Sequence, residues 1–389
     1  MIWVILLCSI FIFAIDYMIA RRWSPQHKKL YLVMAGAISA LPLMISAVGF
    51  LFIRDNTTLF GLISMWVTYV YMILAVARLP FTLSIVASQR AIWRIFGGVV
   101  SLAVVALFVY SMVVTRTDYK VNKVEIVSSR LPGAFDGYRI VQISDLHVGT
   151  MLSPKEELQE IVEICNGLDA DMIVQCGDVV NIRYTELTEE VVGELSQLRA
   201  RDGVYAITGN HDVGVYIKDS ISTTPIYSLL RVKESQQQMG WRMIDSTTEY
   251  VKRGGDSISI TGIGFDRRLQ DHRHSHSLPE LDIAKNYKGV PKDVFNITLA
   301  HMPQLWDDIL RNELADLTLL GHVHAMQLKL PFGKRGVSPS MLLYKRWSGL
   351  YQEQGRSLYI NDGIGCVMYP MRIGLARPEI TLIELQMAR

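Results

Sequence analysis

Four long apolar stretches occupy the beginning of this 389-residue sequence. They cover residues 2–20, 30–53, 59–87 and 95–115. Each is close to or longer than the roughly 20 residues that a helix needs to cross the hydrocarbon core of a bilayer. The pattern therefore predicts a bundle of four transmembrane helices. A cleaved signal peptide is not expected, because no basic segment precedes the first stretch, and Arg21 and Arg22 follow it.

After Tyr119 the apolar positions form short runs that end in polar residues and alternate with segments of helical spacing. The runs are 138–143, 172–175, 204–208, 258–263, 295–300 and 317–320, and further strands are expected at 342–344, 357–360 and 379–385. Residues 154–168 have the spacing of a helix, with Ser153 and Glu156 as its capping box. Alternation of strands and helices predicts a layered α/β domain.

Charge divides the sequence at the same place. Residues 1–115 contain 8 Lys/Arg and 2 Asp/Glu, a net charge of +6, whereas the remainder carries −4. The second part thus has no basic surface for nucleic acid, and no nucleic-acid partner is expected. The four widely spaced cysteines of the whole sequence leave the redox compartment open. We predict a transmembrane domain over 1–118 and a second domain over 119–389.

The basic residues that flank the apolar stretches predict the orientation in the membrane. The first and third connections hold six of them, and the other side is marked by Arg54, Arg116, Lys120 and Lys123. The positive-inside rule then predicts a four-pass protein of the inner or plasma membrane whose second domain is extracytoplasmic. A re-entrant third stretch, broken near Pro80, would place that domain in the cytoplasm instead. Asp16 and Arg78 are candidates for an ion pair within the bundle, or for two side chains that snorkel to the interface.

Five of the predicted strands end in residues that can bind metals. The motifs are Asp145-Leu146-His147, Gly177-Asp178, Gly209-Asn210-His211-Asp212, the single His301, and Gly321-His322-Val323-His324. Open α/β sheets bind ligands at the carboxyl ends of their strands. In an extended segment, residues i and i+2 point the same way, so each D-x-H or H-x-H pair could face one point. Carboxylates with imidazoles suit Mn, Fe or Zn, and seven such groups suggest two ions that share a carboxylate.

In this order the five motifs resemble those of the calcineurin-like metallophosphoesterase superfamily, over roughly 126–385. The resemblance implies an α/β domain with a two-sheet β-sandwich flanked by helices, preceded here by the four-helix transmembrane bundle. It implies two divalent ions, Mn²⁺ first, with Fe²⁺ or Zn²⁺ as alternatives. One ion would be held by Asp145, His147, Asp178 and His324, and the other by Asp178, Asn210, His301 and His322. His211 would lie beside the leaving-group oxygen, and a metal-bound hydroxide would attack phosphorus.

The predicted catalytic residues are His211, Asn181 and Asp212. Many relatives carry an aspartate where this sequence has Asn181, and that aspartate orients the catalytic histidine. An amide can also fix the ring, but it would not raise the pKa of the histidine as a carboxylate does. His211 would then be a weak proton donor, which favours a phosphoanhydride substrate.

The sequence thus predicts a membrane-bound hydrolase of a phosphate ester or anhydride on a lipid or lipid-linked substrate, because a soluble nucleotide would gain nothing from a membrane-confined enzyme. Segments 348–351, 358–365 and 377–381 are similar to a bacterial branch that includes UDP-2,3-diacylglucosamine diphosphatases. Such a diphosphatase on the cytoplasmic side is one alternative. A metal- or phosphate-binding sensor or scaffold without turnover is another, and a transport bundle with a regulatory phosphatase is a third.

Two further segments carry possible chemistry. His272, His274 and His276 lie in a polar stretch that predicts a solvated loop, with a substrate-contacting lid as the alternative. Residues 341–347 combine Tyr344 and Trp347 with two cations, which suits docking at lipid headgroups. A buried strand followed by a solvated turn would give the same pattern.

Overall fold

The computed structural model describes residues 2–23, 29–30, 32–37, 40, 44, 58–88, 90–217, 219, 221–272, 279, 281–333, 335–367 and 369–388. The chain divides into two compact units. The first comprises Met1–Val114, Lys218–Ser220 and Met368–Met371, and the second comprises Thr115–Ile217, Ile221–Val367 and Arg372–Arg389. Each unit is described by itself.

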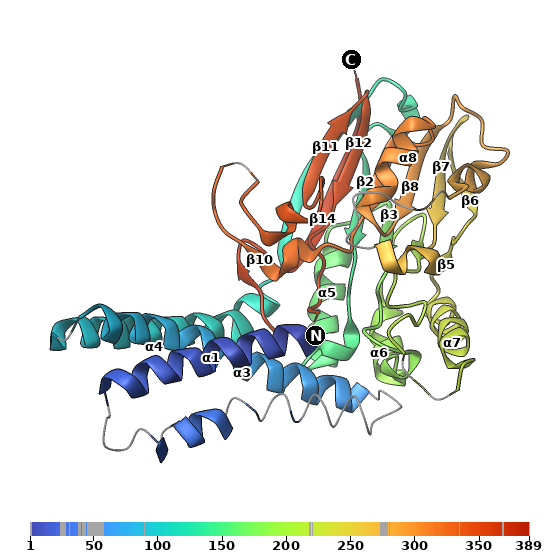
Figure 1. Ribbon diagram of the computed structural model, residues 1–389. Helices are drawn as coiled ribbons and strands as arrows, with labels where there is room; N and C mark the ends of the chain where they lie inside the picture. The colour runs from blue at the N-terminus through green and yellow to red at the C-terminus, as the bar shows by residue number, and fades with distance from the viewer. Residues whose placement is uncertain are drawn as a thin grey trace. The chain divides into compact units, whose positions relative to one another are not determined.

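Long apolar helices make up the described part of the first unit. They are α1 (Ile2–Trp23), α3 (Thr58–Ala87) and α4 (Ala91–Val113), and α3 contacts both others (Figure 1). Two helical stretches among the described residues, Met65–Ala87 and Ala91–Thr117, are long and apolar enough to cross a membrane, and Ser9–Ala20 is a shorter apolar helix. The predicted second span, 30–53, lies largely outside the described residues, so the four-helix bundle is not confirmed.

An ion pair joins α1 to α3. Arg78 Nη1 lies 3.0 Å from each carboxylate oxygen of Asp16, which is 1% exposed. Two turns along α3, the hydroxyl of Tyr71 donates to Ser9 Oγ at 3.0 Å. Because a buried carboxylate without a partner is costly, this pairing fixes the register of the two helices. Of the two interpretations of Asp16 and Arg78, the structure has the ion pair.

Two six-stranded sheets form the frame of the second unit (Figure 1). In order across the first sheet lie β1 (Lys120–Ser128), β14 (Glu379–Met387), β2 (Tyr138–Ile143), β3 (Met172–Cys176), β4 (Val204–Ile207) and β5 (Arg242–Met243). Across the second lie β11 (Gly349–Glu353), β12 (Arg356–Ile360), β9 (Leu317–Leu320), β8 (Phe295–Ala300), β7 (Asp256–Ile263) and β6 (Thr248–Arg253). The short strands β10 (Leu328–Lys329) and β13 (Ile373–Gly374) pair with each other.

Within each sheet, the strands that precede the predicted metal-binding motifs are parallel to one another. β2, β3 and β4 run parallel in the first sheet, and β8 and β9 run parallel in the second. Parallel neighbours end at the same edge of a sheet, so the segments that follow them emerge close together. This arrangement confirms the predicted α/β domain with two sheets.

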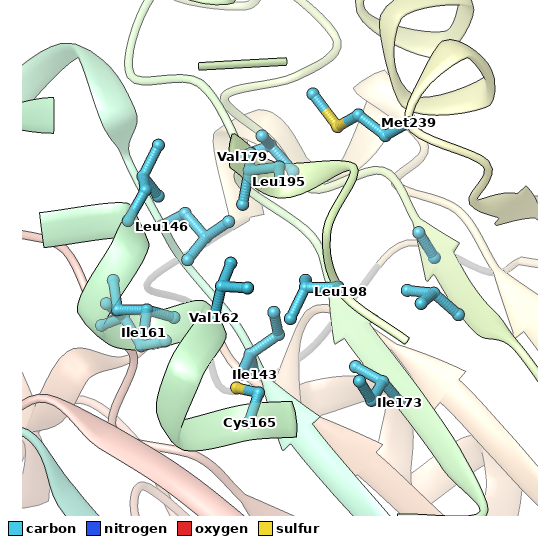
Figure 2. Close-up of a cluster of buried hydrophobic side chains, with 14 of the residues drawn as sticks. Ile143, Leu146, Ile161, Val162, Cys165, Ile173, Val179, Leu195, Leu198 and Met239 are labelled. Atoms are coloured by element: carbon cyan, nitrogen blue, oxygen red, sulfur yellow. The ribbon is translucent and has the colours of Figure 1, made fainter. Parts of the chain in front are cut away.

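Alternating side chains place three apolar layers around the sheets. Ile140, Met172 and Val174 face the space between the sheets and share a buried cluster with Ile260, Ile297 and Leu319. Their sequence neighbours Val141, Ile143 and Ile173 pack outward against α5 (Pro154–Gly167), and α6 (Glu189–Leu195) joins that layer. Figure 2 shows Ile161, Val162 and Cys165 of α5 gathered over Ile143. On the second sheet, α8 (Trp306–Arg311) buries Trp306 and Ile309.

The predicted elements differ from the observed ones in two informative places. Residues 342–344 were expected to be a strand, but the 3₁₀ turn Pro339–Leu342 lies there, opened by Ser338, whose Oγ accepts from Ser340 N at 3.1 Å. Ser153 does precede α5, yet no capping box forms with Glu156. Glu157 accepts from the N–H groups of Leu152 and Ser153 instead, each at 3.0 Å, while it also pairs with Arg116 at 2.7 Å.

Candidate metal centre

The motifs predicted to bind metal come together at the carboxyl ends of five strands. The loops after β2, β3 and β4 bring residues 145–147, 178 and 209–212, and the loops after β8 and β9 bring His301 and residues 321–324. Three overlapping groups of ligand atoms lie within 4.8 Å of one another: Asp145 with His147 and His324, His147 with Asp178 and His211, and Asp178 with His301 and His322. Asp178 is thus shared between groups.

One subsite is formed by Asp145, His147 and His324. The Nε2 atoms of the two histidines are 3.2 Å apart, and His324 Nε2 is 3.1 Å from Asp145 Oδ1. Asp178 Oδ2 closes this side at 3.8 Å from His147 Nε2. Two imidazole nitrogens and two carboxylates therefore point at one small volume.

The second subsite lies on the other side of Asp178. His301 Nε2 is 3.1 Å from Asp178 Oδ2 and 2.9 Å from Asn210 Oδ1. His322 Nδ1 is also 2.9 Å from Asn210 Oδ1. Asp178 is 1% exposed, and its Oδ1 accepts from the backbone N–H of His211 at 2.7 Å. This bond holds the shared carboxylate in place.

The backbone achieves this convergence in an unexpected way. Asp145, His147, Asp178, His322 and His324 all have positive φ angles, between 43° and 74°. The sequence analysis predicted that residues i and i+2 of each motif lie in an extended segment and point the same way. This prediction is wrong, since these residues have left-handed backbone angles. It is also wrong that His322 and His324 face one point, because they belong to different groups of ligand atoms. Such conformations cost non-glycine residues of order 1–3 kcal/mol each and are typical of functional sites.

Hydrogen bonds to the far ring nitrogens orient the histidines. His301 Nδ1 donates to the carbonyl of Cys176 at 2.8 Å, which directs Nε2 at Asp178 and Asn210. On the other side, Arg372 is fully buried, and its Nη1 donates to the carbonyl of Asp362 at 3.0 Å while Nη2 lies 3.4 Å from His324 Nδ1. Such contacts fix the tautomer and the ring plane of a metal ligand. The sequence offered no signal for Arg372.

The electrostatics of the site favour a bound cation. Burial lowers the pKa of His147, and it lowers that of His322 to about 3, so both imidazoles are neutral with available lone pairs. Burial also lowers the pKa of His301, but the carboxylates of Asp178 and Asp145 raise it to about 9. The second subsite thus strongly favours positive charge. Imidazole nitrogens with carboxylate and amide oxygens are ligands that suit divalent transition metals, so the residues present fit two such ions.

His211 lies between the two subsites and the Asn181 loop. Its Nδ1 donates to the backbone carbonyl of Asn181 at 2.5 Å. The acceptor is thus a main-chain oxygen, whereas the sequence had suggested the side-chain amide. Burial lowers the pKa of His211 despite the nearby carboxylate of Asp178. Its Nε2 is the nitrogen left to face a substrate.

Two buried carboxylates support the loops around His211. Asp212 accepts from four backbone N–H groups, those of Asp178, Val179, Val180 and Gly209, at 2.7–3.2 Å. It thereby joins the β3 loop to the β4 loop, and its predicted catalytic role stays a prediction. Glu186, which the sequence analysis missed, accepts from the N–H groups of Asn181 and Ile182 at 2.5 and 2.9 Å. Glu186 therefore fixes the carbonyl that His211 contacts.

The structure describes part of the two further segments, and the ring of Tyr344 lies edge-on to that of His322 with centroids 6.2 Å apart. His272 ends the 3₁₀ helix η5 (Arg267–His272), while His274 and His276 lie outside the described residues. Trp347 and Tyr344 are buried, at 5% and 6% exposed, so they are not available for headgroup contact. Of the two interpretations of 341–347, the headgroup one is wrong for these aromatic residues.

The fold and the site define a two-sheet α/β domain with candidate metal ligands gathered at the carboxyl ends of five strands. A family model described as calcineurin-like phosphoesterase matches residues 138–326. The Bacillus subtilis "Uncharacterized metallophosphoesterase YkuE" is 30% identical over 268 residues, which cover 67% of this chain and 83% of that protein. The chain belongs to the calcineurin-like phosphoesterase family.

Some relatives of this chain are named as transmembrane proteins. The "Transmembrane protein with metallophosphoesterase domain" of Danio rerio is 31% identical over 287 residues, covering 72% of this chain and 61% of that protein. This chain therefore spans about three fifths of the length of the vertebrate relatives it matches. The "UDP-2,3-diacylglucosamine pyrophosphatase LpxG" of Chlamydia muridarum is 27% identical over 312 residues, covering 69% and 92%. The apolar helices and the transmembrane relatives together indicate membrane association.

The division into subsites predicts distinct losses of metal. His324→Ala and His322→Ala should each reduce the manganese content of the purified full-length protein from about two ions to about one, and Asp178→Asn should remove nearly all of it. Elemental analysis after dialysis measures this content. Asp308→Asn, at a partly exposed carboxylate on α8 that pairs with Arg311, is the matched control and should keep both ions. Retention of both ions by either histidine variant would contradict the division.

Proposed function

We propose that the protein is an integral membrane metallophosphoesterase that hydrolyses a phosphoanhydride of a lipid or lipid-linked substrate. The observation that carries this proposal is the sharing of Asp178 between two subsites, with His211 beside it. When bound, two divalent ions, manganese foremost, would supply Lewis-acid chemistry at the phosphoryl group and at the attacking water. Asp145, His147, Asp178 and His324 would hold one ion, and Asp178, Asn210, His301 and His322 the other.

The protein residues would orient the substrate and handle its leaving group. His211 is placed to hydrogen-bond the leaving oxygen through Nε2, because its Nδ1 is committed to the Asn181 carbonyl. A carbonyl oxygen carries no full negative charge, so it stabilises a protonated imidazole less than an aspartate would. His211 would therefore be a weak acid. A phosphate leaving group needs little protonation, which supports an anhydride over an alkyl ester.

The proposal of a lipid substrate is based on the short link between the last apolar helix and the second domain. β1 begins at Lys120, after a six-residue link from the end of α4 at Val113. Such a link spans at most about 25 Å, so the start of β1 stays near the membrane end of α4. Within this proposal the chain crosses the membrane four times, residues 1–118 form the transmembrane domain, and residues 119–389 form the phosphoesterase domain. The distribution of basic residues supports an extracytoplasmic location for the second domain.

A second candidate is a UDP-2,3-diacylglucosamine diphosphatase on the cytoplasmic side. The relative from Chlamydia muridarum carries that activity in its name and is matched over 92% of its length. Both candidates break an anhydride on a lipid-bearing molecule. They differ in the side of the membrane and in the group beyond the second phosphate.

The leaving-group argument predicts unequal effects of removing His211. His211→Ala should lower the turnover of an alkyl phosphodiester roughly 10²–10⁴-fold, the usual contribution of a general acid. It should lower that of a lipid diphosphate by less than about 10-fold, because the departing phosphate is already a stable anion. Steady-state assays with manganese measure both, with metal content checked in parallel. Equal losses on both substrates would count against an anhydride substrate, and turnover unaffected by both His211→Ala and Asp178→Asn would refute the enzyme proposal.

Reporter fusions decide between the two candidates. A reporter active only outside the cytoplasm, fused after residue 389, should be active, and one active only in the cytoplasm should be silent. That result directs assays to outer-leaflet lipid diphosphates. The reverse pattern would exclude the extracytoplasmic proposal and favour the UDP-linked diacyl sugar.

A further inference from the structure

A cavity of about 310 Å³ lies between α7 (Thr224–Gln238), the end of β7, and the 3₁₀ segments η5 and η6 (Ile283–Tyr287). Thr208 and Val213, which flank the G-N-H-D motif, line one side. Phe265 lines another, and its ring centroid is 6.4 Å from that of His301. The cavity therefore shares a wall with the second metal subsite.

Four of the six charged side chains around the cavity form two ion pairs. Lys233 Nζ lies 2.6 Å from Asp245 Oδ2, and Arg268 Nη2 lies 2.6 Å from Asp266 Oδ2. Lys285 and Asp282 also line the cavity, so three cations face three carboxylates. A phosphate would be attracted by the first set and repelled by the second. The lining thus favours an uncharged ligand rich in hydrogen-bonding groups.

The remaining lining combines apolar side chains with the neutral polar residues Thr208, Ser246 and Asn286. Ile263, Phe265 and Leu269 are each less than 10% exposed and belong to the buried cluster that covers the second sheet. Apolar walls with placed polar groups are typical of pockets for small molecules, and this volume lies at the lower end of their range. A sugar or heterocyclic ring combines a broad apolar face with polar edges in the same way.

We infer that this cavity binds an uncharged sugar or heterocyclic ring, which forms the non-reacting head group of the phosphate substrate. The inference rests on the proposed function and specifies its substrate class. Asp245 links the ring site to the metal site, because it accepts from the N–H and the hydroxyl of Thr208 at 2.8 and 2.9 Å. Thr208 is two residues before Asn210, so an occupied cavity would steady the loop that carries this predicted ligand.

Filling the cavity tests the inference. Leu229 lines the cavity, whereas its neighbour Leu230 is 61% exposed on the same helix and does not line it. Leu229→Trp should weaken binding of N-acetylglucosamine or uridine to the full-length protein at least about 10-fold, as measured by ligand-observed NMR with and without EDTA. Leu230→Trp should bind the same probe as the wild type does. Inorganic phosphate should not compete with the ring when EDTA is present.

Kinetics then connect the cavity to catalysis. For a lipid diphosphate that carries the bound ring, Leu229→Trp should raise KM about 10-fold without changing metal content. For the same lipid diphosphate without a ring, KM should not change. If the wild-type protein hydrolyses the lipid diphosphate but binds neither N-acetylglucosamine nor uridine, the ring-binding inference is wrong and the proposed function stands. The same holds if Leu229→Trp and Leu230→Trp have equal KM values for the ring-bearing substrate. Ring binding without turnover of any phosphate would instead refute the proposed function.

A different set of contacts singles out Tyr216. Asn210 Nδ2 donates to Tyr216 Oη at 3.1 Å, and this bond directs the amide oxygen toward His301 Nε2 and His322 Nδ1. The ring of Tyr216 also lies against that of His211, with centroids 4.2 Å apart and planes tilted by 37°. One side chain therefore touches both a predicted metal ligand and the predicted acid.

The structure assigns to Tyr216 the role of a positioning residue that acts separately on these two neighbours. Through its hydroxyl it fixes the Asn210 amide with the oxygen toward the second subsite. Through its ring it limits rotation of His211. This role could not be predicted from the sequence, because Tyr216 follows the G-N-H-D motif by four residues and belongs to no recognised pattern.

Two substitutions separate the hydroxyl from the ring. Tyr216→Phe should weaken binding of the second Mn²⁺ about 10-fold in calorimetric titration, as loss of an outer hydrogen bond to a ligand does, and leave the first ion unchanged. Tyr216→Leu should add a fall in kcat. Tyr250→Phe, at an exposed tyrosine of β6, is the matched control. Wild-type affinity for both ions in Tyr216→Phe, or equal weakening of both, would overturn the assignment.

Discussion

The constraint on which the domain depends is the burial of the Asp178 carboxylate between two sets of imidazoles. A buried charge costs several kcal/mol unless it is paired and hydrogen-bonded. The histidines and backbone N–H groups around the carboxylate must therefore approach it closely. Residues at these close approaches cannot carry a side chain. A Cβ on Gly177 would lie 2.6 Å from His301 Nδ1, and one on Gly209 would lie 2.6 Å from Asp178 N. The glycines of the G-D and G-N-H-D motifs are thus needed because no side chain fits beside the carboxylate.

The same constraint explains which parts of the fold and of the candidate site could be predicted from the sequence. Strands such as β2, β8 and β9 begin and end where the apolar runs predicted, because each is buried on both faces between other layers. The groups that converge on Asp178 could be anticipated because each directly follows such a strand. The family resemblance assigned His322 and His324 to different ions, but the left-handed backbone angles that separate them could not be anticipated, since no local pattern specifies them. Supporting contacts from Tyr216, Glu186 and Arg372 arise from loops whose paths are set only by the folded structure.

The predicted metal subsites and the proposed ring-binding cavity lie in different parts of the domain. The metal subsites are built from strand ends and from carboxylates that bind backbone N–H groups, as Asp212 does with four of them. The cavity beside Phe265 is lined instead by α7 and by 3₁₀ segments, with ion pairs at its edge. The predicted metal ligands, which are shared by the family, are thus held by the ends of the sheet strands. Choice of substrate can change through the surrounding segments without disturbing the ligands.

The position of β14 has a consequence for how the protein is made. This strand follows all the predicted metal ligands in the sequence, yet it lies between β1 and β2, and it pairs with β1 along nine residues. During synthesis the apolar helices emerge first, and the first sheet cannot close until residues 379–387 have left the ribosome. In the membrane-anchored protein that we propose, the apolar helices are thus complete before β14 can close the first sheet. The domain therefore finishes folding while it is already tethered.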